Sequence, residues 1–435
     1  MNIVQLTPGA GKMYCGNCFR DNALVKELRR MGHDTLMMPL YLPLTLEDED
    51  ATEDAPIFYN GIKVYLEQKS SAFRNAPKFV HELVGARRFL DWASGKAAKT
   101  RADEVGDLAI SMLLGEDGNQ ARELDELIAF LREQGQPDVV CLSNAMLLGL
   151  ARRIRTELNV PVVCMLQGEH AYIESMSPDS REAVWKVMRE RAQDADLFVA
   201  PSRYFADLMN VRLRVPESKL KVVHNGIDLE GYSPAVSRPP TPVLGYFARM
   251  CRDKGLDLVV DAFLKLKTRN QIEGLKLWIG GGCGPGDEPF VAEMRDRINA
   301  KGWISDVEYY PNLSKKDKQE FYRRISVLSV PSSEGEAFGL YLAEAMASGT
   351  PVVQPAHSAF PELIELTGGG VVADGTDADA LAAALEPLLM DRKRLDALGK
   401  SARRAAEEHF TVHAMAVKVA EAFEELGRPD AAGLA

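Results

Sequence analysis

The sequence predicts an α/β protein made of two consecutive doubly wound domains, each a parallel sheet covered by helices. Three observations support this class: a length of 435 residues, a strand–helix alternation that begins near residue 3 and restarts near residue 243, and a proline-rich segment between the two runs. At about 150 residues per domain, this length suggests two or three domains. An apolar content of 46% and a charged content of 26% are typical of globular proteins, so disordered and collagen-like classes are excluded.

The first domain is expected to span residues 1–235. It opens with an apolar strand at 3–6, a glycine-containing loop, a helix that Gly32 ends, and a second strand at 34–39. Strand–helix–strand units at this spacing predict parallel pairing. Further strands are expected at 139–142, 160–166, 197–200 and 221–223, whereas residues 44–135 fit the alternation poorly and are interpreted as an insertion.

Residues 233–242 contain four prolines and are interpreted as a stiff linker. The alternation then resumes at 243–246, with strands expected at 275–279, 307–310, 327–330 and 352–353, which gives a second domain over 236–411. The remaining segment, 412–435, contains an amphipathic helix over 412–426.

Charge and cysteine content narrow the class of function. A net charge of −11 argues against a broad nucleic-acid surface. Six cysteines in so long a chain do not resemble a disulfide framework, so a reducing cytoplasm is expected. The first residues lack the basic region of a secretory signal, and no run of about 18 apolar residues occurs.

Two glycine loops follow predicted strands. Gly9 and Gly11 lie in the first loop, but Tyr14 occupies the third glycine position of a dinucleotide fingerprint, and Met13 replaces the Ser or Thr of a P-loop. The loop at 280–282 fails the same fingerprint because Pro285 stands at its third glycine position. Gly9 and Gly11 are therefore interpreted either as an anion-binding turn at a helix N-terminus or as an ordinary tight turn.

The second domain carries a more specific pattern. Arg249 and Lys254 follow a predicted strand at the edge where open parallel sheets bind ligands, and two cations there suit a diphosphate. Glu344 lies among apolar neighbours in a predicted helix, where a carboxylate needs partners such as the vicinal hydroxyls of a ribose. Glu336, in the preceding loop, suits a second sugar.

These residues resemble the family 4 retaining glycosyltransferases of the GT-B fold. The spacing of Glu336 and Glu344 is similar to the family's E-x7-E nucleotide-sugar motif, and Arg249 and Lys254 match its paired diphosphate cations. Its further landmarks match at Pro201-Ser202, at 225–228, at Pro361-Glu362 and at 368–370, so the resemblance covers nearly the whole chain outside 44–135.

The resemblance implies two Rossmann-like domains facing across a cleft, with the helix at 412–426 crossing back to the first domain. It implies that Glu344 holds ribose hydroxyls, that Glu336 holds the donor sugar, and that the backbone amides of Phe338, Gly339 and Leu340 contact the phosphate or the sugar. It also implies a retaining, metal-independent transfer from a UDP- or GDP-sugar to a hydroxyl acceptor, without a cofactor. The acidic run 48–50 is accordingly interpreted as a surface loop and not as a metal motif.

One position departs from the family pattern. Where many members carry a histidine after a strand of the first domain, this chain reads Gln167-Gly168-Glu169-His170. Either Gln167 contacts the sugar or His170 reaches in, and His170 could instead be a capping or structural residue.

The start of the first helix contains the acceptor-contact candidates. Asn17, Arg20 and Asp21 lie there beside a C-x-x-C pair, Cys15 and Cys18. The pair is interpreted as small, partly buried residues, with a redox role as the alternative.

The basic and aromatic segment 73–101 is interpreted as a surface helix, with peripheral membrane or lipid-acceptor contact as the alternative. Two other functions remain open for the chain. One is a phosphorylase or sugar-nucleotide epimerase on the same fold; the other is a non-catalytic sugar-nucleotide-binding or redox-sensing module.

Overall fold

The computed structural model describes residues 1–9, 16–43, 50–52, 55–59, 102–236, 241–333 and 335–427, with the side chains of 102–105 and 427 left out. The chain forms two compact units. Unit 1 contains Met1–Pro201, Phe205–Val223 and Ala416–Ala435, and unit 2 contains Ser202–Tyr204 and His224–Met415. The described residues leave out four features of the sequence analysis: the predicted cleft between two domains, the segment 73–101, Gly11 and Cys15.

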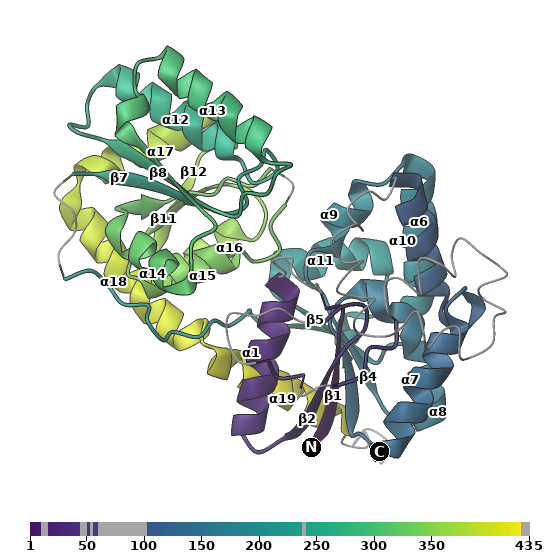
Figure 1. Ribbon diagram of the computed structural model, residues 1–435. Helices are drawn as coiled ribbons and strands as arrows, with labels where there is room; N and C mark the ends of the chain where they lie inside the picture. The colour runs from purple at the N-terminus through teal and green to yellow at the C-terminus, as the bar shows by residue number, and fades with distance from the viewer. Residues whose placement is uncertain are drawn as a thin grey trace. The chain divides into compact units, whose positions relative to one another are not determined.

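Unit 1 is a parallel six-stranded sheet in the order β2-β1-β3-β4-β5-β6. Figure 1 shows α1 and α19 on one side of this sheet and α7 and α8 on the other. The strands are β1 Asn2–Thr7, β2 Asp34–Pro39, β3 Val139–Leu142, β4 Val162–Met165, β5 Leu197–Ala200 and β6 Leu220–Val222. The α-helices are α1 Gly16–Arg30, α6 Ala102–Leu114, α7 Ala121–Glu133, α8 Ala151–Leu158, α9 Glu169–Glu174, α10 Pro178–Ala192, α11 Arg203–Leu213 and α19 Val412–Gly427.

Unit 2 is a second parallel six-stranded sheet, in the order β12-β11-β10-β7-β8-β9. In Figure 1, α12 and α13 cover one face and α14 and α15 the other. Its strands are β7 Val243–Phe247, β8 Lys276–Gly281, β9 Val307–Pro311, β10 Val327–Leu328, β11 Val352–Pro355 and β12 Gly370–Ala373. Its α-helices are α12 Leu256–Arg269, α13 Glu288–Ala300, α14 Lys315–Arg324, α15 Leu340–Ala347, α16 Phe360–Thr367, α17 Ala378–Met390 and α18 Arg392–His409.

The predicted α/β class, with two doubly wound parallel sheets, is therefore confirmed. Strands β3, β4 and β5 are apolar and buried at every position, because helices cover both faces of the sheet. In unit 2 the strand order reverses between β7 and β10. Open α/β sheets bind ligands beyond the carboxyl ends of the strands at such a reversal.

The division between the units does not coincide with the proline-rich segment. The continuous part of unit 2 begins at His224, upstream of the expected boundary at residue 235, because the intervening residues pair within unit 2. The amide of Ile227 donates to the carbonyl of Phe410 at 2.8 Å, and the Tyr232 hydroxyl donates to Glu344 at 3.0 Å. Residues 224–232, which precede the proline-rich segment, thus belong to unit 2.

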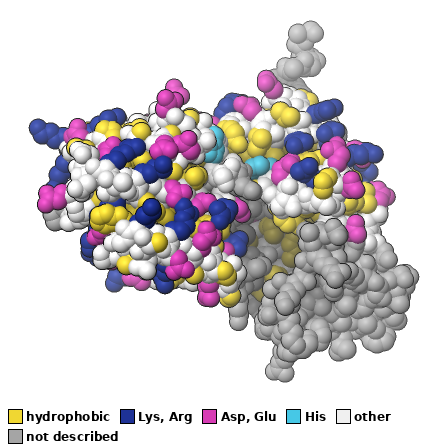
Figure 2. Space-filling view, turned by 90° about the horizontal axis from the view of Figure 1, so that it is seen from above, with side chains coloured by type: hydrophobic (Ala, Val, Ile, Leu, Met, Phe, Trp, Pro, Cys, Tyr) yellow, Lys and Arg dark blue, Asp and Glu magenta, His cyan; other side chains and the backbone are white. Residues whose placement is uncertain are grey.

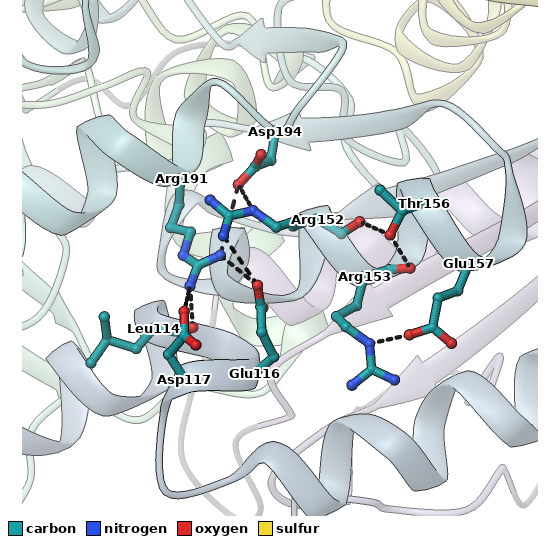
Figure 3. A network of polar contacts seen from close by, with 9 residues as sticks. All are labelled: Leu114, Glu116, Asp117, Arg152, Arg153, Thr156, Glu157, Arg191 and Asp194. Atoms are coloured by element: carbon teal, nitrogen blue, oxygen red, sulfur yellow. Dashed lines mark hydrogen bonds and ion pairs between the residues drawn. The ribbon is translucent and has the colours of Figure 1, made fainter.

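An ion-pair network attaches part of the expected insertion to unit 1 (Figure 3). The guanidinium of Arg191, whose side chain is only 4% exposed, contacts Glu116 at 3.1 Å and Asp117 at 3.0 Å, next to the end of α6. Arg152 of α8 contacts the same Glu116 at 3.2 Å and Asp194 at 3.1 Å. Arginine suits this role because its planar group contacts several oxygens at once.

No helix among the described residues is long and apolar enough to cross a membrane. On the face drawn in Figure 2, Lys and Arg side chains are interspersed with Asp and Glu, so that face shows no broad surface of a single charge sign.

Candidate functional site

The candidate donor site lies in unit 2, at the reversal between β7 and β10. The loop after β7 carries Arg249 and Lys254, and the loop after β10 carries Glu336. Hydrogen bonds connect the two loops. The hydroxyl of Ser332 and the amide of Ser333, after β10, both donate to the carbonyl of Asp253, after β7, at 3.1 and 3.0 Å. Residues far apart in sequence are therefore held at one edge of the sheet.

Lys254 and Glu336 form an ion pair in this site. The Lys254 ammonium lies 2.7 Å from the Glu336 carboxylate, and the Tyr341 hydroxyl donates to the same oxygen at 3.1 Å. Burial alone would lower the pKa of Lys254, but the charge and hydrogen bond of Glu336 outweigh it and raise that pKa. Lys254 therefore keeps its positive charge at neutral pH.

Arg249 is paired with Asp287, which directly precedes α13. The guanidinium approaches the carboxylate with Nη2 at 2.9 Å and Nε at 3.0 Å from Oδ1. Burial alone would raise the pKa of Asp287, but the hydrogen bonds from Arg249 and the Gly284 amide outweigh it and lower that pKa. Asp287 carries a weak signal in the sequence, namely its place just before a predicted helix and after a glycine-rich stretch, and sequence reasoning missed it.

Phe338, Gly339 and Leu340 lie where α15 begins. Gly339 precedes the helix with φ = 82°, in the region that favours glycine, and its carbonyl accepts the Leu342 amide at 2.9 Å. A Cβ on Gly339 would lie 3.1 Å from the Tyr341 ring and 3.3 Å from the Glu336 side chain. The first amides of a helix have no partner within it, so this turn can bind an anion.

Glu344 is held by three side chains of unit 2. Its carboxylate accepts the Lys318 ammonium at 2.6 Å, the Tyr232 hydroxyl at 3.0 Å and the Tyr322 hydroxyl at 3.0 Å. The apolar surroundings of Glu344 in the sequence indicated that its carboxylate needs partners, but they did not identify Lys318, Tyr232 or Tyr322 as those partners. A carboxylate accepts about four hydrogen bonds, so a ribose would share it with these residues or displace one of them.

Gly9 lies in the loop after β1 of unit 1, with φ = 73°. A Cβ at this position would lie 1.8 Å from the carbonyl oxygen of Leu42, so only glycine fits there. This close packing supports the tight-turn interpretation, while Gly11, its predicted partner in anion binding, is not described. Asn17 lies partly exposed in the first turn of α1.

Arg20 and Asp21, two of the predicted acceptor contacts, lie inside unit 1. Their ion pair is 2.7 Å long, and neither side chain has exposed surface. Asp21 accepts the Thr7 hydroxyl at 2.8 Å, and Arg20 donates to the carbonyl of Ser143 at 3.0 Å. A direct contact with an acceptor would need them exposed, so in this structure they instead support the ends of β1 and β3.

Gln167 lies in the loop after β4 and His170 in the first turn of α9, and both are partly exposed. This loop is organised by Glu169, which is 7% exposed and which the sequence analysis did not weigh. The Glu169 carboxylate accepts the amides of Ala145 and Gln167 at 2.7 Å and of Gly168 at 2.8 Å. The His170 ring packs edge-on against Phe205 with centroids 5.2 Å apart.

The C-x-x-C pair is described only in part. Cys18 is 2% exposed and packs with Val25, Met37 and Ala51, in agreement with the interpretation as a small buried residue. Cys15 lies outside the described residues, so a pairing of the two thiols stays untested. Within the described ranges, no group of three or more His, Cys, Asp or Glu side chains is placed to hold a metal ion.

Comparison with known families agrees with this geometry. Residues 109–230 match the model of the family described as Glycosyltransferase Family 4, and residues 234–405 match that of Glycosyl transferases group 1. The sucrose-phosphate synthase of Thermosynechococcus elongatus has the same fold, with a TM-score of 0.69 over 98% of this chain and 99% of that chain at 16% identity. The chain belongs to the family 4 glycosyltransferases of the GT-B fold.

A second structure of this glycosyltransferase fold is Alr3699/HepE of Anabaena, solved in complex with UDP, with a TM-score of 0.69 and 17% identity over 98% of this chain and all of that chain. Among named relatives, the D-inositol 3-phosphate glycosyltransferase of Mycobacterium marinum is 30% identical over 45% of this chain and 42% of its own length. The lipopolysaccharide core biosynthesis mannosyltransferase LpsB of Rhizobium meliloti is 29% identical over 48% and 61%. The glycosyltransferase chain spans about half the length of the first curated relatives it matches.

Proposed function

We propose that this chain transfers a sugar from a UDP- or GDP-sugar to a hydroxyl group of an acceptor. The observation that carries the proposal is the placement of Arg249 and of the Lys254–Glu336 ion pair in the loops after β7 and β10, at the strand-order reversal of unit 2, with Glu344 on the helix α15 that follows. The family membership and the names of the relatives, which include glycosyltransferases for inositol phosphate and lipopolysaccharide core, support the same reaction class.

In this proposal Arg249 and Lys254 neutralise the diphosphate as it leaves. Charge builds up on the β-phosphate oxygens when the glycosidic bond breaks, and fixed cations stabilise that charge more in the transition state than before it. The amides of Phe338, Gly339 and Leu340 add the donors of a helix N-terminus. Glu336 and Glu344 then bind hydroxyls of the donor sugar and of the ribose.

The finer steps are also proposals. We propose retention of the anomeric configuration, with the leaving phosphate helping to deprotonate the acceptor hydroxyl, and no need for a bound metal or cofactor. Gln167 or His170 of unit 1 would contact the donor sugar, and Asn17 the acceptor. The acceptor would be a glycan, a lipid-linked molecule or a small molecule, and segment 73–101 would supply peripheral membrane contact if the acceptor is lipid-linked.

Calorimetry with UDP and with GDP tests the donor site and identifies the base. Arg249→Ala should weaken binding of the preferred nucleotide at least ten-fold, since it removes a charged partner of the phosphates. Arg252→Ala is the matched control, because Arg252 lies in the same loop, is 60% exposed and pairs with Asp257 instead. Equal binding by the wild type and the Arg249 variant would refute the assignment of the site.

A turnover assay separates transfer from the alternatives. Slow hydrolysis of the preferred nucleotide-sugar by the wild type, lost in Glu336→Ala, would support a transferase. Dependence of product formation on inorganic phosphate would instead identify a phosphorylase. Nucleotide binding without any turnover would favour a non-catalytic module.

A further inference from the structure

The proposed roles leave unused the Gly280–Asp287 loop, which consists of the last two residues of β8 together with the turn that leads to α13. It contains five glycines yet matches neither nucleotide fingerprint. The structure fixes it at two points beside the candidate donor site. The amide of Met250 donates to the carbonyl of Gly282 at 2.8 Å, and Asn312 bonds both the amide and the carbonyl of Cys283 at 2.9 Å each.

The loop ends in a carboxylate that is itself held in place. Asp287 has a side chain only 8% exposed, and its Oδ2 accepts the Gly284 amide at 3.0 Å. The backbone amide of Asp287 donates to the carbonyl of Gly284 at 2.9 Å. Asp287 is therefore fixed by its own loop before any contact with Arg249 is counted.

The arginine that Asp287 meets is largely exposed. The Arg249 side chain is 66% exposed, and it meets Asp287 through one edge, Nε and Nη2. A long exposed side chain loses rotamer freedom when a ligand immobilises it, which opposes binding. A guanidinium has five N–H donors, so the contact with Asp287 leaves the Nη1 donors for another anion.

We propose that Asp287 is a positioning residue, which holds the guanidinium of Arg249 oriented so that its remaining donors meet the diphosphate of the nucleotide-sugar. This inference rests on the proposed function. It also assigns a use to the Gly280–Asp287 loop, whose small residues let the carboxylate reach the loop after β7. The opposite effect would follow if Asp287 merely competed with the diphosphate for Arg249, because removing its charge would then tighten binding.

The test is a double-mutant cycle on binding of UDP and GDP, with the full chain. Asp287→Asn keeps an oxygen that can accept the Gly284 amide but loses the charge, and we expect the preferred nucleotide to bind roughly ten-fold more weakly, the scale of one charge-assisted hydrogen bond. Asp257→Asn is the matched control, since it removes the partner of Arg252 at 2.8 Å from the same region, and should leave affinity unchanged.

The cycle decides between positioning and a general structural effect. In an Arg249→Ala background, Asp287→Asn should cost no further affinity, because its effect passes through Arg249. Additive losses, unchanged affinity or tighter binding in Asp287→Asn would overturn the inference. Asp287→Glu, which keeps the charge, should bind more tightly than Asp287→Asn and serves as the second variant if the asparagine protein does not fold.

The two proposals fail in different ways. If Arg249→Ala weakens nucleotide binding while Asp287→Asn does not, only the positioning role is overturned. If Arg249→Ala also leaves binding unchanged, both the donor site and the positioning role are overturned.

Discussion

Glu169 offers a direct test of how the loop after β4 is organised. Its carboxylate accepts three backbone amides, from Ala145, Gln167 and Gly168, at 2.7 to 2.8 Å. Glu169→Ala leaves these three donors without their partner. An orphaned buried donor costs about 1–3 kcal/mol. Because the site is 7% exposed and water can reach part of it, we take the lower end, about 3 kcal/mol in total.

The expected change in Tm follows from this free-energy cost and from the size of unit 1. A domain of about 150–250 residues loses roughly 2–4 °C in Tm per kcal/mol, so the transition of unit 1 should fall by roughly 6–12 °C. Glu169→Gln should lower the Tm less than Glu169→Ala does, because the carbonyl oxygen of Gln can still accept two of the amides. The third amide would face the NH2 group, which cannot accept its hydrogen bond.

Hydrogen exchange gives the local readout. A peptide covering residues 166–170 should exchange markedly faster in Glu169→Ala, while a peptide from α13 in unit 2 should be unchanged. Differential scanning calorimetry on the same proteins measures the Tm. A Tm within 1 °C of the wild type, together with unchanged exchange over 166–170, would refute the view that Glu169 holds this loop.

Three further outcomes are expected. Arg20→Ala leaves the buried Asp21 carboxylate without its counter-charge and should destabilise unit 1 by about 3–5 kcal/mol, measured by urea unfolding; a loss below about 1 kcal/mol would contradict a buried ion pair. Gly339→Ala places a Cβ at φ = 82° and should cost about 1–2 kcal/mol in stability and weaken nucleotide binding, and unchanged binding in calorimetry would argue against a role for this turn. Glu362 accepts the Arg203 amide at 2.8 Å and faces His224 at 3.5 Å. Burial alone would raise the pKa of Glu362, but these hydrogen bonds lower it below the ordinary 4.5. The stability that Glu362 contributes is therefore present above pH 4.5 and is lost as the pH falls through the lowered pKa. The stability difference between the wild type and Glu362→Gln should therefore shrink as the pH falls below 4.5, and a difference that grows below that pH would show that the sign is wrong.

Local patterns in the sequence determined the class of fold and most strands. The strands expected at 34–39, 139–142 and 197–200 match the structure at both ends. The latter two are apolar and buried at every position, as central parallel strands are. After β3 the chain forms two consecutive helical segments, a 3-10 helix at Ala145–Leu150 and α8 at Ala151–Leu158. A short apolar run does not distinguish the two, since both bury the same side chains.

The sequence also placed the charged residues of the donor site, because they follow strands and open helices. Arg249, Lys254 and Glu336 lie in the loops after β7 and β10, on either side of the reversal of strand order, and Glu344 lies in α15, the helix that follows.

Only the tertiary structure decided which groups these residues meet. Asp287 lies 38 positions from Arg249, and Lys318 lies 26 positions from Glu344. Such pairings depend on the order β12-β11-β10-β7-β8-β9, which brings loops together that no local pattern connects. Burial had the same origin: Arg20 and Asp21 look like surface polar residues in sequence, yet they form an enclosed pair once β1, β3 and β4 meet. Periodicity reports the face of one element, whereas partners and burial depend on which elements become neighbours.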